Sequence, residues 1–157
     1  MATFTGTSGN DSLLGTEVAD TIEALAGNDT VNAGTGNDTI FGGQGTDRLF
    51  GELGDDTFVE DQVIQGAELF DGGDGFDTIE LRPVPIPFRF TLGVGTLSQH
   101  NFNPATLVSI ERVVFASTPT EFILGTFTLA QASGISEFVG GGGRDILSLQ
   151  LPGYPQQ

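Results

Sequence analysis

In the first part of the chain, six aspartates follow one another at a constant spacing of nine residues: Asp11, Asp20, Asp29, Asp38, Asp47 and Asp56. The nonapeptides that carry them run from GTSGNDSLL at 6–14 to GELGDDTFV at 51–59. Displaced copies follow at 72–80 and 140–148, where Asp77 and Asp145 take the aspartate's place. Self-similarity at a fixed period is the sequence signature of repeat architectures. We therefore expect one small structural unit to be stacked many times.

Each place in the nonapeptide has a physical reason. Glycines at the first, second and fourth places permit the positive φ angles and close backbone approach of a tight turn. The last three residues alternate polar, apolar and polar, as in Thr21–Ile22–Glu23, which predicts a short strand with one side chain facing inward. One repeat is then half a coil, and 18 residues complete a coil. The pattern predicts an all-β fold, a parallel β-roll or β-solenoid.

Alternate aspartates fall on opposite edges of such a roll. Asp11, Asp29 and Asp47 would line one edge, and Asp20, Asp38 and Asp56 the other. Coils stack roughly 4.8 Å apart, so the carboxylates would repel one another strongly. A divalent cation between coils removes the repulsion, and carboxylate and turn carbonyl oxygens suit Ca²⁺, which takes about six to eight oxygen ligands. The predicted bridging pairs are Asp11/Asp29, Asp29/Asp47, Asp20/Asp38 and Asp38/Asp56.

The predicted sites for several Ca²⁺ ions comprise the eight repeat aspartates and glycines of their turns. The aspartates are Asp11, Asp20, Asp29, Asp38, Asp47, Asp56, Asp77 and Asp145, and the glycines are Gly6, Gly9, Gly27, Gly34, Gly36, Gly42, Gly45, Gly51, Gly54, Gly72 and Gly75. Two turns are expected to give weak or empty sites, because Val18–Ala19 replaces Gly–Asn and the repeat 24–32 opens with Ala–Leu. Asp55 and Asp74 are either extra ligands or solvated charges.

The negative charge of the chain lies in its first half. Residues 1–80 hold 17 acidic residues against Arg48 alone, a net charge of −16, whereas residues 81–157 are neutral. Such a charge repels nucleic-acid phosphates and anionic lipids, so neither is an expected partner. It also opposes compaction until cations neutralise it. We therefore expect a chain that folds when a counter-ion binds.

These repeats resemble the haemolysin-type, or RTX, family, whose pattern is G-G-x-G-x-D-x-U-x with U a large apolar residue. The resemblance covers residues 6–59, 72–80 and 140–148. It implies a parallel β-roll, Ca²⁺-dependent folding, and type I export to the outside of the cell or to the cell surface. In that family the export signal is C-terminal and is retained. This fits the first residues, which lack the basic and apolar regions of a Sec signal peptide.

The chain is expected to contain two regions, a calcium-binding roll over 1–80 and an apolar β continuation over 81–157 that carries the isolated repeat at 140–148. The second region would extend the same solenoid, with strands near 88–92, in 106–117 and in 120–131. Residues 60–71 interrupt the period, and we expect them to form a longer coil that bulges. Counting residues therefore leaves open which edge Asp77 joins.

The sequence offers little for catalysis. It contains no cysteine, and His100 is the sole histidine. The sequence has no HExxH motif for a zinc site and no GxSxG motif for a nucleophile and its base, so neither kind of site is expected. There is also no run of about 18 apolar residues, so no membrane-spanning segment is expected.

The predicted function is non-enzymatic: an extracellular calcium-binding structural protein that folds on binding Ca²⁺. One form of this hypothesis is a self-assembling surface or matrix component, favoured by Met1 and by an open sheet edge near 2–5. The alternative is a C-terminal module of a larger type I-secreted enzyme, which serves export and stability or binds an acidic polysaccharide.

Overall fold

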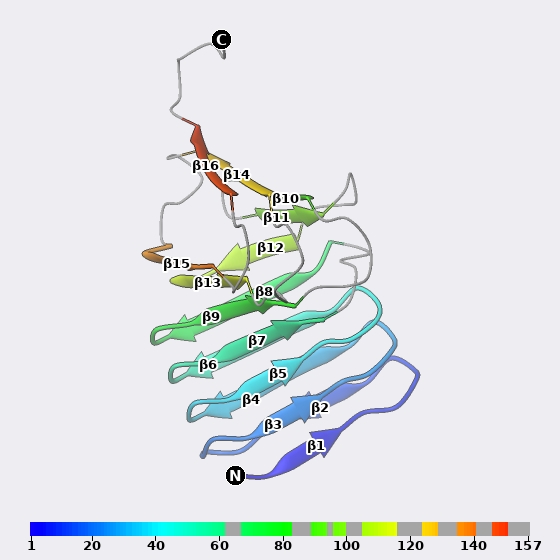
Figure 1. The fold of residues 1–157 in the computed structure, drawn as a ribbon. Helices are drawn as coiled ribbons and strands as arrows, with labels where there is room; N and C mark the ends of the chain where they lie inside the picture. Colours follow the sequence, from blue (N-terminus) through cyan, green and yellow to red (C-terminus); the bar gives the residue numbers. More distant parts are fainter. Residues whose placement is uncertain are drawn as a thin grey trace.

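The computed structural model describes residues 1–61, 67–82, 89–93, 96–99, 105–115, 124–128, 135–140 and 146–150. Over these residues the chain forms strands and no helix, and it winds as a parallel β-solenoid whose two sheets face each other (Figure 1). No helix in this part of the chain is long and apolar enough to cross a membrane. The predicted fold class is therefore confirmed.

Strands of the two sheets alternate along the repeat region. In the described part, the first sheet is, in spatial order, β1 (Thr3–Thr5), β3 (Thr21–Glu23), β5 (Thr39–Phe41), β7 (Thr57–Glu60), β9 (Thr78–Leu81), β13 (Arg112–Phe115) and β15 (Glu137–Val139). The second is β16 (Ile146–Gln150), β14 (Leu124–Thr128), β10 (Arg89–Gly93), β11 (Thr96–Gln99), β12 (Ala105–Val108), β8 (Leu69–Asp74), β6 (Arg48–Leu53), β4 (Thr30–Thr35) and β2 (Ser12–Leu14).

Strand register follows the predicted coil length. Thr21 of β3 pairs with Thr39 of β5, which is an offset of 18 residues. The coil between β7 and β9 is longer, since Thr57 of β7 pairs with Thr78 of β9 at an offset of 21 residues. The three additional residues belong to the interruption at 60–71, which the solenoid accommodates within one enlarged coil.

The core is a column of side chains between the two sheets. The apolar residue two places after each aspartate faces inward, and Ile22, Val31, Ile40, Leu49, Phe58 and Ile79 are buried. Within the core, the rings of Phe58 of β7 and Phe70 of β8 meet edge to face, with their centroids 5.8 Å apart. At the N-terminal end, Phe4 and Leu13 pack on this column but are only partly buried. The inward column fixes the register of the coils, and thereby the position of every aspartate.

Beyond residue 81, parallel pairing continues in part. Strand β13 pairs with β9 and β12 pairs with β8, both in parallel, but β11 is antiparallel to both of its neighbours, β10 and β12. The predicted strand segment 106–117 is divided in two by a turn at 109–111. The segments near 88–92 and in 120–131 contain β10 and β14. The division of the chain at residue 80 stays a prediction.

Candidate metal sites

The first row of aspartates lies on one edge of the roll, as predicted. The backbone N–H of Asp11 donates to Oδ1 of Asp29 at 2.7 Å, and the N–H of Asp29 donates to Oδ1 of Asp47 at 2.9 Å. Each carboxylate thus fixes the start of the strand in the coil before it. The predicted pairs Asp11/Asp29 and Asp29/Asp47 are direct neighbours in this row.

The second row repeats the arrangement on the opposite edge. The N–H of Asp20 donates to Oδ1 of Asp38 at 2.7 Å, and that of Asp38 donates to Oδ1 of Asp56 at 2.8 Å. The N–H of Asp56 then donates to Oδ1 of Asp77 at 2.8 Å. Asp77 therefore joins the second row, which counting residues had left open. Asp145 lies outside the described residues.

One oxygen of four of these carboxylates is buried without a hydrogen-bond donor. Asp29, Asp38 and Asp56 are each 1% exposed and Asp77 is 0% exposed. The Oδ2 atoms of these four residues have no hydrogen-bond partner among the described residues. An ionised oxygen buried in this way is costly unless a positive charge compensates it. The four orphaned oxygens, that of Asp29 in the first row and the other three in the second, therefore fit cations between the coils on both edges.

The protonation behaviour of the rows has the same cause. Burial raises the pKa of Asp47 to about 6, against hydrogen bonding from the Asp29 N–H and with a smaller contribution from the Asp29 charge. Burial likewise raises the pKa of Asp56 to about 7, and the charges of Asp38 and Asp77 add to it. Both shifts express the cost of packing carboxylates without a cation, and both favour a bound one.

The first-place glycine of a turn can lie directly beside the carboxylate of that turn. A Cβ on Gly51, at the first place of its turn, would lie 2.2 Å from Oδ2 of Asp56 and 2.6 Å from the carbonyl oxygen of Gly72 in the next coil. Carboxylate and carbonyl oxygens therefore converge on the space that a side chain would fill. Both are hard oxygen donors of the kind that Ca²⁺ takes as ligands. First-place glycines in the same position beside their own aspartate are Gly6, Gly42 and Gly72.

The fourth-place glycines bring neighbouring coils into contact. Gly54 has φ +131°, and a Cβ there would lie 2.0 Å from the carbonyl oxygen of Gly36 in the preceding coil. The others with positive φ and equally close backbone neighbours are Gly27, Gly36, Gly45 and Gly75, and second-place Gly34 is similar. Gly9 differs, because a Cβ there would lie 3.9 Å from Oγ1 of Thr7, an ordinary contact distance. Most predicted turn glycines are thus required by the stacking itself.

The two N-terminal turns already supply donors to their carboxylates. Oδ2 of Asp11 accepts the N–H and hydroxyl of Thr7, and Oδ2 of Asp20 accepts the same two groups of Thr16. The Thr16 hydroxyl, followed by the Ala2 N–H, lowers the pKa of Asp20. In the third turn, Leu25 takes φ +78°, a conformation that side chains rarely adopt. The weakness of sites at 15–20 and 24–29 stays a prediction.

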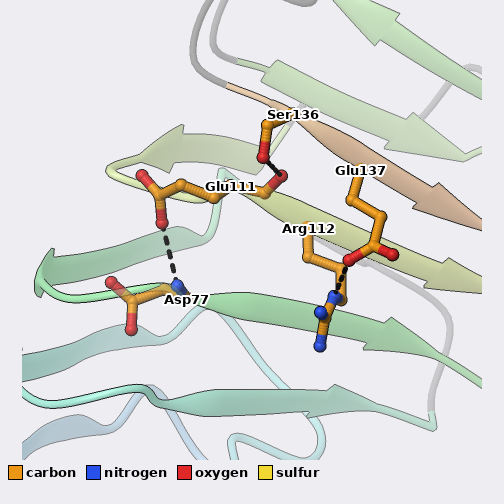
Figure 2. Close-up of polar contacts among 5 residues, drawn as sticks. All are labelled: Asp77, Glu111, Arg112, Ser136 and Glu137. Carbon is orange, nitrogen blue, oxygen red and sulfur yellow. Dashed lines mark hydrogen bonds and ion pairs between the residues drawn. The ribbon is translucent and has the colours of Figure 1, made fainter.

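Two glutamates that the nonapeptide pattern did not identify continue the rows. Glu68 precedes β8 and is 3% exposed, and the N–H of Leu69 donates to the carbonyl of Asp47 just as that of Arg48 donates to Asp29. Glu111 precedes β13 and accepts the N–H of Asp77 through Oε2 at 2.8 Å (Figure 2). One signal was present in the sequence. Each glutamate is followed two places later by a buried apolar residue, Phe70 or Val113, as each aspartate is.

A further ladder runs along the exposed side of the turns. The side-chain oxygen of Asn10 accepts the N–H of Asn28 at 2.8 Å, and that of Asn37 accepts the N–H of Asp55 at 3.1 Å. Oδ1 of Asp55 then accepts the N–H of Phe76 at 2.9 Å. Asp55 therefore joins coils through its hydrogen bond, and Asp74 is exposed.

Each candidate site combines carboxylates from adjacent coils with backbone oxygens. Among the described residues, no three side chains of His, Cys, Asp or Glu form a metal-binding group. His100 lies outside these residues. Backbone carbonyls of the turns must therefore supply much of any coordination shell, as the turn geometry around Gly51 and Gly72 allows.

Comparison with known families agrees with this geometry. A family model described as RTX calcium-binding nonapeptide repeat (4 copies) matches residues 5–40, 25–58 and 65–80. No curated protein matches the sequence. The matched segments contain both rows of aspartates as far as Asp77, and they end before β12 and β13.

Proposed function

We propose that this chain is a non-enzymatic extracellular structural protein that folds when Ca²⁺ binds, because the model of the RTX calcium-binding nonapeptide repeat matches residues 5–40, 25–58 and 65–80. The observation that carries the proposal is the pair of aspartate rows. The Oδ2 atoms of Asp29, Asp38, Asp56 and Asp77 are buried with no hydrogen-bond donor among the described residues. A structure that buries so many carboxylates side by side requires cations.

Coupling of folding to calcium follows from the charge. Residues 1–80 carry a net charge of −16, and the roll stacks these acids coil on coil. Without a cation, repulsion opposes this stacking and the chain stays expanded. Extracellular calcium modules bind with dissociation constants of roughly 10⁻⁴–10⁻³ M, so the chain would fold outside the cell. Each ordered coil templates the next, which makes filling of the sites cooperative.

Equilibrium dialysis of the full chain against radioactive calcium tests the binding. We expect several ions per chain at 5 mM CaCl₂, with a sigmoidal dependence on the free ion concentration. The same chain in 5 mM MgCl₂ is the control, because Mg²⁺ demands a small octahedral shell and keeps its water. Binding of less than one calcium ion per chain would contradict the proposal.

The N-terminal end of the roll supports self-assembly as the form this structural role takes. Strands β1 and β2 end their respective sheets, so each has a backbone edge that pairs with no other described strand. At the same end the core residues Phe4 and Leu13 are only partly covered, and Leu14 is 69% exposed. Open strand edges accept further strands. A second copy of this chain presents the same edges, and pairing about a two-fold axis would cover both.

Light scattering coupled to size exclusion tests this assembly. In 5 mM CaCl₂ we expect a mass of at least twice 16.4 kDa, which returns to 16.4 kDa in chelator. Thr3→Pro removes one backbone donor at the edge of β1 and should weaken the assembly. A monomer in calcium at all concentrations would contradict self-assembly while leaving calcium binding unaffected.

A further inference from the structure

We propose that Glu111 is a calcium ligand that, with Asp77, forms one more site at the end of the second row. This inference rests on the proposed calcium binding, but it extends the row beyond the nonapeptides, because the matched segments end at residue 80. It therefore places a ligand beyond the segments that match the repeat model.

The hydrogen bonds around Glu111 reproduce those of the aspartate row. The N–H of Asp77 donates to Oε2 of Glu111 at 2.8 Å, and the N–H of Arg112 donates to the carbonyl of Asp77 at 2.9 Å. One coil earlier, the N–H of Asp56 donates to Oδ1 of Asp77 at 2.8 Å, and the N–H of Thr78 donates to the carbonyl of Asp56 at 2.9 Å. Figure 2 shows the Glu111 carboxylate directly above the Asp77 backbone nitrogen. Glu111 thus has the place of a row aspartate.

A buried oxygen faces this position. Asp77 is 0% exposed, and its Oδ2 has no hydrogen-bond partner among the described residues. A Cβ on Gly72 would lie 2.3 Å from that oxygen and 2.1 Å from the carbonyl oxygen of Ser109. In the same way, a Cβ on Gly51 would lie next to Oδ2 of Asp56 and the carbonyl oxygen of Gly72 in the next coil. Carboxylate and carbonyl oxygens therefore converge in the same way in both coils.

The shorter turn explains why a glutamate stands here. Asp71 pairs with Val108 and Thr78 pairs with Arg112, so residues 72–77 of one turn face only residues 109–111 of the next. Ser109 takes φ +48° in this tight turn. A glutamate side chain has one more methylene group than aspartate. That extra length lets Glu111 reach back to Asp77 from a turn that is shorter by three residues.

Contacts from the next coil hold the backbone of Glu111 in place, and the Arg112 side chain follows Glu111 at the end of the second row. The N–H of Ser136 donates to the Glu111 carbonyl at 2.7 Å, so the next coil fixes its backbone. The adjacent Arg112 forms an ion pair with Glu137 (Figure 2). Its guanidinium carbon also lies 4.8 Å from the centre of the Phe76 ring. A fixed positive side chain thus follows the last carboxylate. Calcium between Asp77 and Glu111 would tie β13 to the roll and make the folding of both parts depend on the same ion.

A crystal structure of the full chain grown in 10 mM CaCl₂ tests the site directly through anomalous scattering. We expect an ion with a Glu111 oxygen at about 2.3–2.6 Å, the usual calcium–oxygen distance. Ions between Asp38 and Asp56 but none at Glu111 would overturn this inference and leave the proposed function intact. No ion at any aspartate would overturn both.

Calorimetric titration with CaCl₂ gives a second test in solution. Glu111→Gln keeps an oxygen that accepts the Asp77 N–H but removes the charge, and we expect it to bind one ion fewer than the unmodified chain. Glu137→Gln is the matched control, because it makes the same change at the ion pair with Arg112. It should retain the full number of ions. An unchanged number and an affinity within twofold for Glu111→Gln would show that Glu111 acts only as a hydrogen-bond acceptor.

Discussion

The backbone N–H of Asp38 donates a 2.8 Å hydrogen bond to Oδ1 of Asp56, one coil further along the chain, and both residues are 1% exposed. The contact uses one carboxylate oxygen to join two coils and leaves Oδ2 of each residue without a donor among the described residues. The same group therefore organises the backbone with one oxygen and leaves the other for the proposed calcium ion. This double use distinguishes the row aspartates from the acids on the surface of the turns.

Asp38→Asn should have opposite effects with and without calcium. Asparagine keeps the oxygen that accepts the Asp20 N–H at 2.7 Å, but it carries no charge. In chelator the variant should be more folded than the unmodified chain, because repulsion within the row falls. In calcium its folding midpoint should shift to roughly tenfold higher concentration, equal to about 1.4 kcal/mol. Circular dichroism measures both, and Glu17→Gln, an exposed acid of a neighbouring turn, is the control. Equal shifts in both variants would argue against a specific row.

Gly51→Ala should block one ion site by filling its space. The added Cβ would lie 2.2 Å from Oδ2 of Asp56 and 2.6 Å from the Gly72 carbonyl. We expect the calcium midpoint of folding to rise at least about tenfold. Gly9→Ala is the matched control, since its added Cβ would lie 3.9 Å from Oγ1 of Thr7, and it should shift the midpoint by less than about twofold. If both variants fold at the calcium concentration of the unmodified chain, the turn space is not a metal site.

Acid should partly replace calcium. In the metal-free roll, burial raises the pKa of Asp47 to about 6 and that of Asp56 to about 7, from an ordinary value of 3.8. A carboxyl group with a raised folded pKa stabilises the folded chain below its unfolded pKa, and this stability is lost as the pH rises through the folded value. Strand content in calcium-free buffer should therefore increase as the pH falls from 7 to 4. In calcium the sign reverses, because protons compete with the ion. Circular dichroism at fixed ionic strength checks both, and loss of strand content on acidification without calcium would contradict this.

Phe58→Ala should destabilise the calcium-loaded roll by about 3–5 kcal/mol, as large-to-small changes in a packed core do. Phe58 is 0% exposed and meets the Phe70 ring at 5.8 Å. Phe50→Ala is the control, because Phe50 is only half-buried and lies 5.7 Å from the Arg48 guanidinium carbon on the outer face. Its effect should be about 1 kcal/mol or less. Urea unfolding in saturating calcium measures both, and equal losses would show that the inward column is not the core.

The repeat region was predictable because its period is strict. Counting by nine placed Asp29 beside Asp47 and Asp38 beside Asp56, and the register confirms the 18-residue coil. Asp77 could not be assigned to an edge, since the three additional residues of its coil change the count.

The remaining features depend on information that the period does not contain. Glu68 and Glu111 were not predicted as row residues, because a search for aspartate at fixed spacing does not find a glutamate in an irregular coil. The antiparallel direction of β11 was equally hidden, because alternation of polar and apolar residues is the same in either direction. The row position of each glutamate and the direction of β11 depend on which residues lie next to them in space. Those neighbours become known only when the coils are seen stacked.

Far-ultraviolet circular dichroism of the full chain, recorded first in chelator and then through a titration with CaCl₂, tests calcium-coupled folding most directly. We expect little strand signal in chelator and a cooperative rise at roughly 10⁻⁴–10⁻³ M free Ca²⁺. The same concentrations of MgCl₂ should produce only a small fraction of that rise. A strand signal that is already complete in chelator at pH 7.5, with no change on adding calcium, would contradict the proposal.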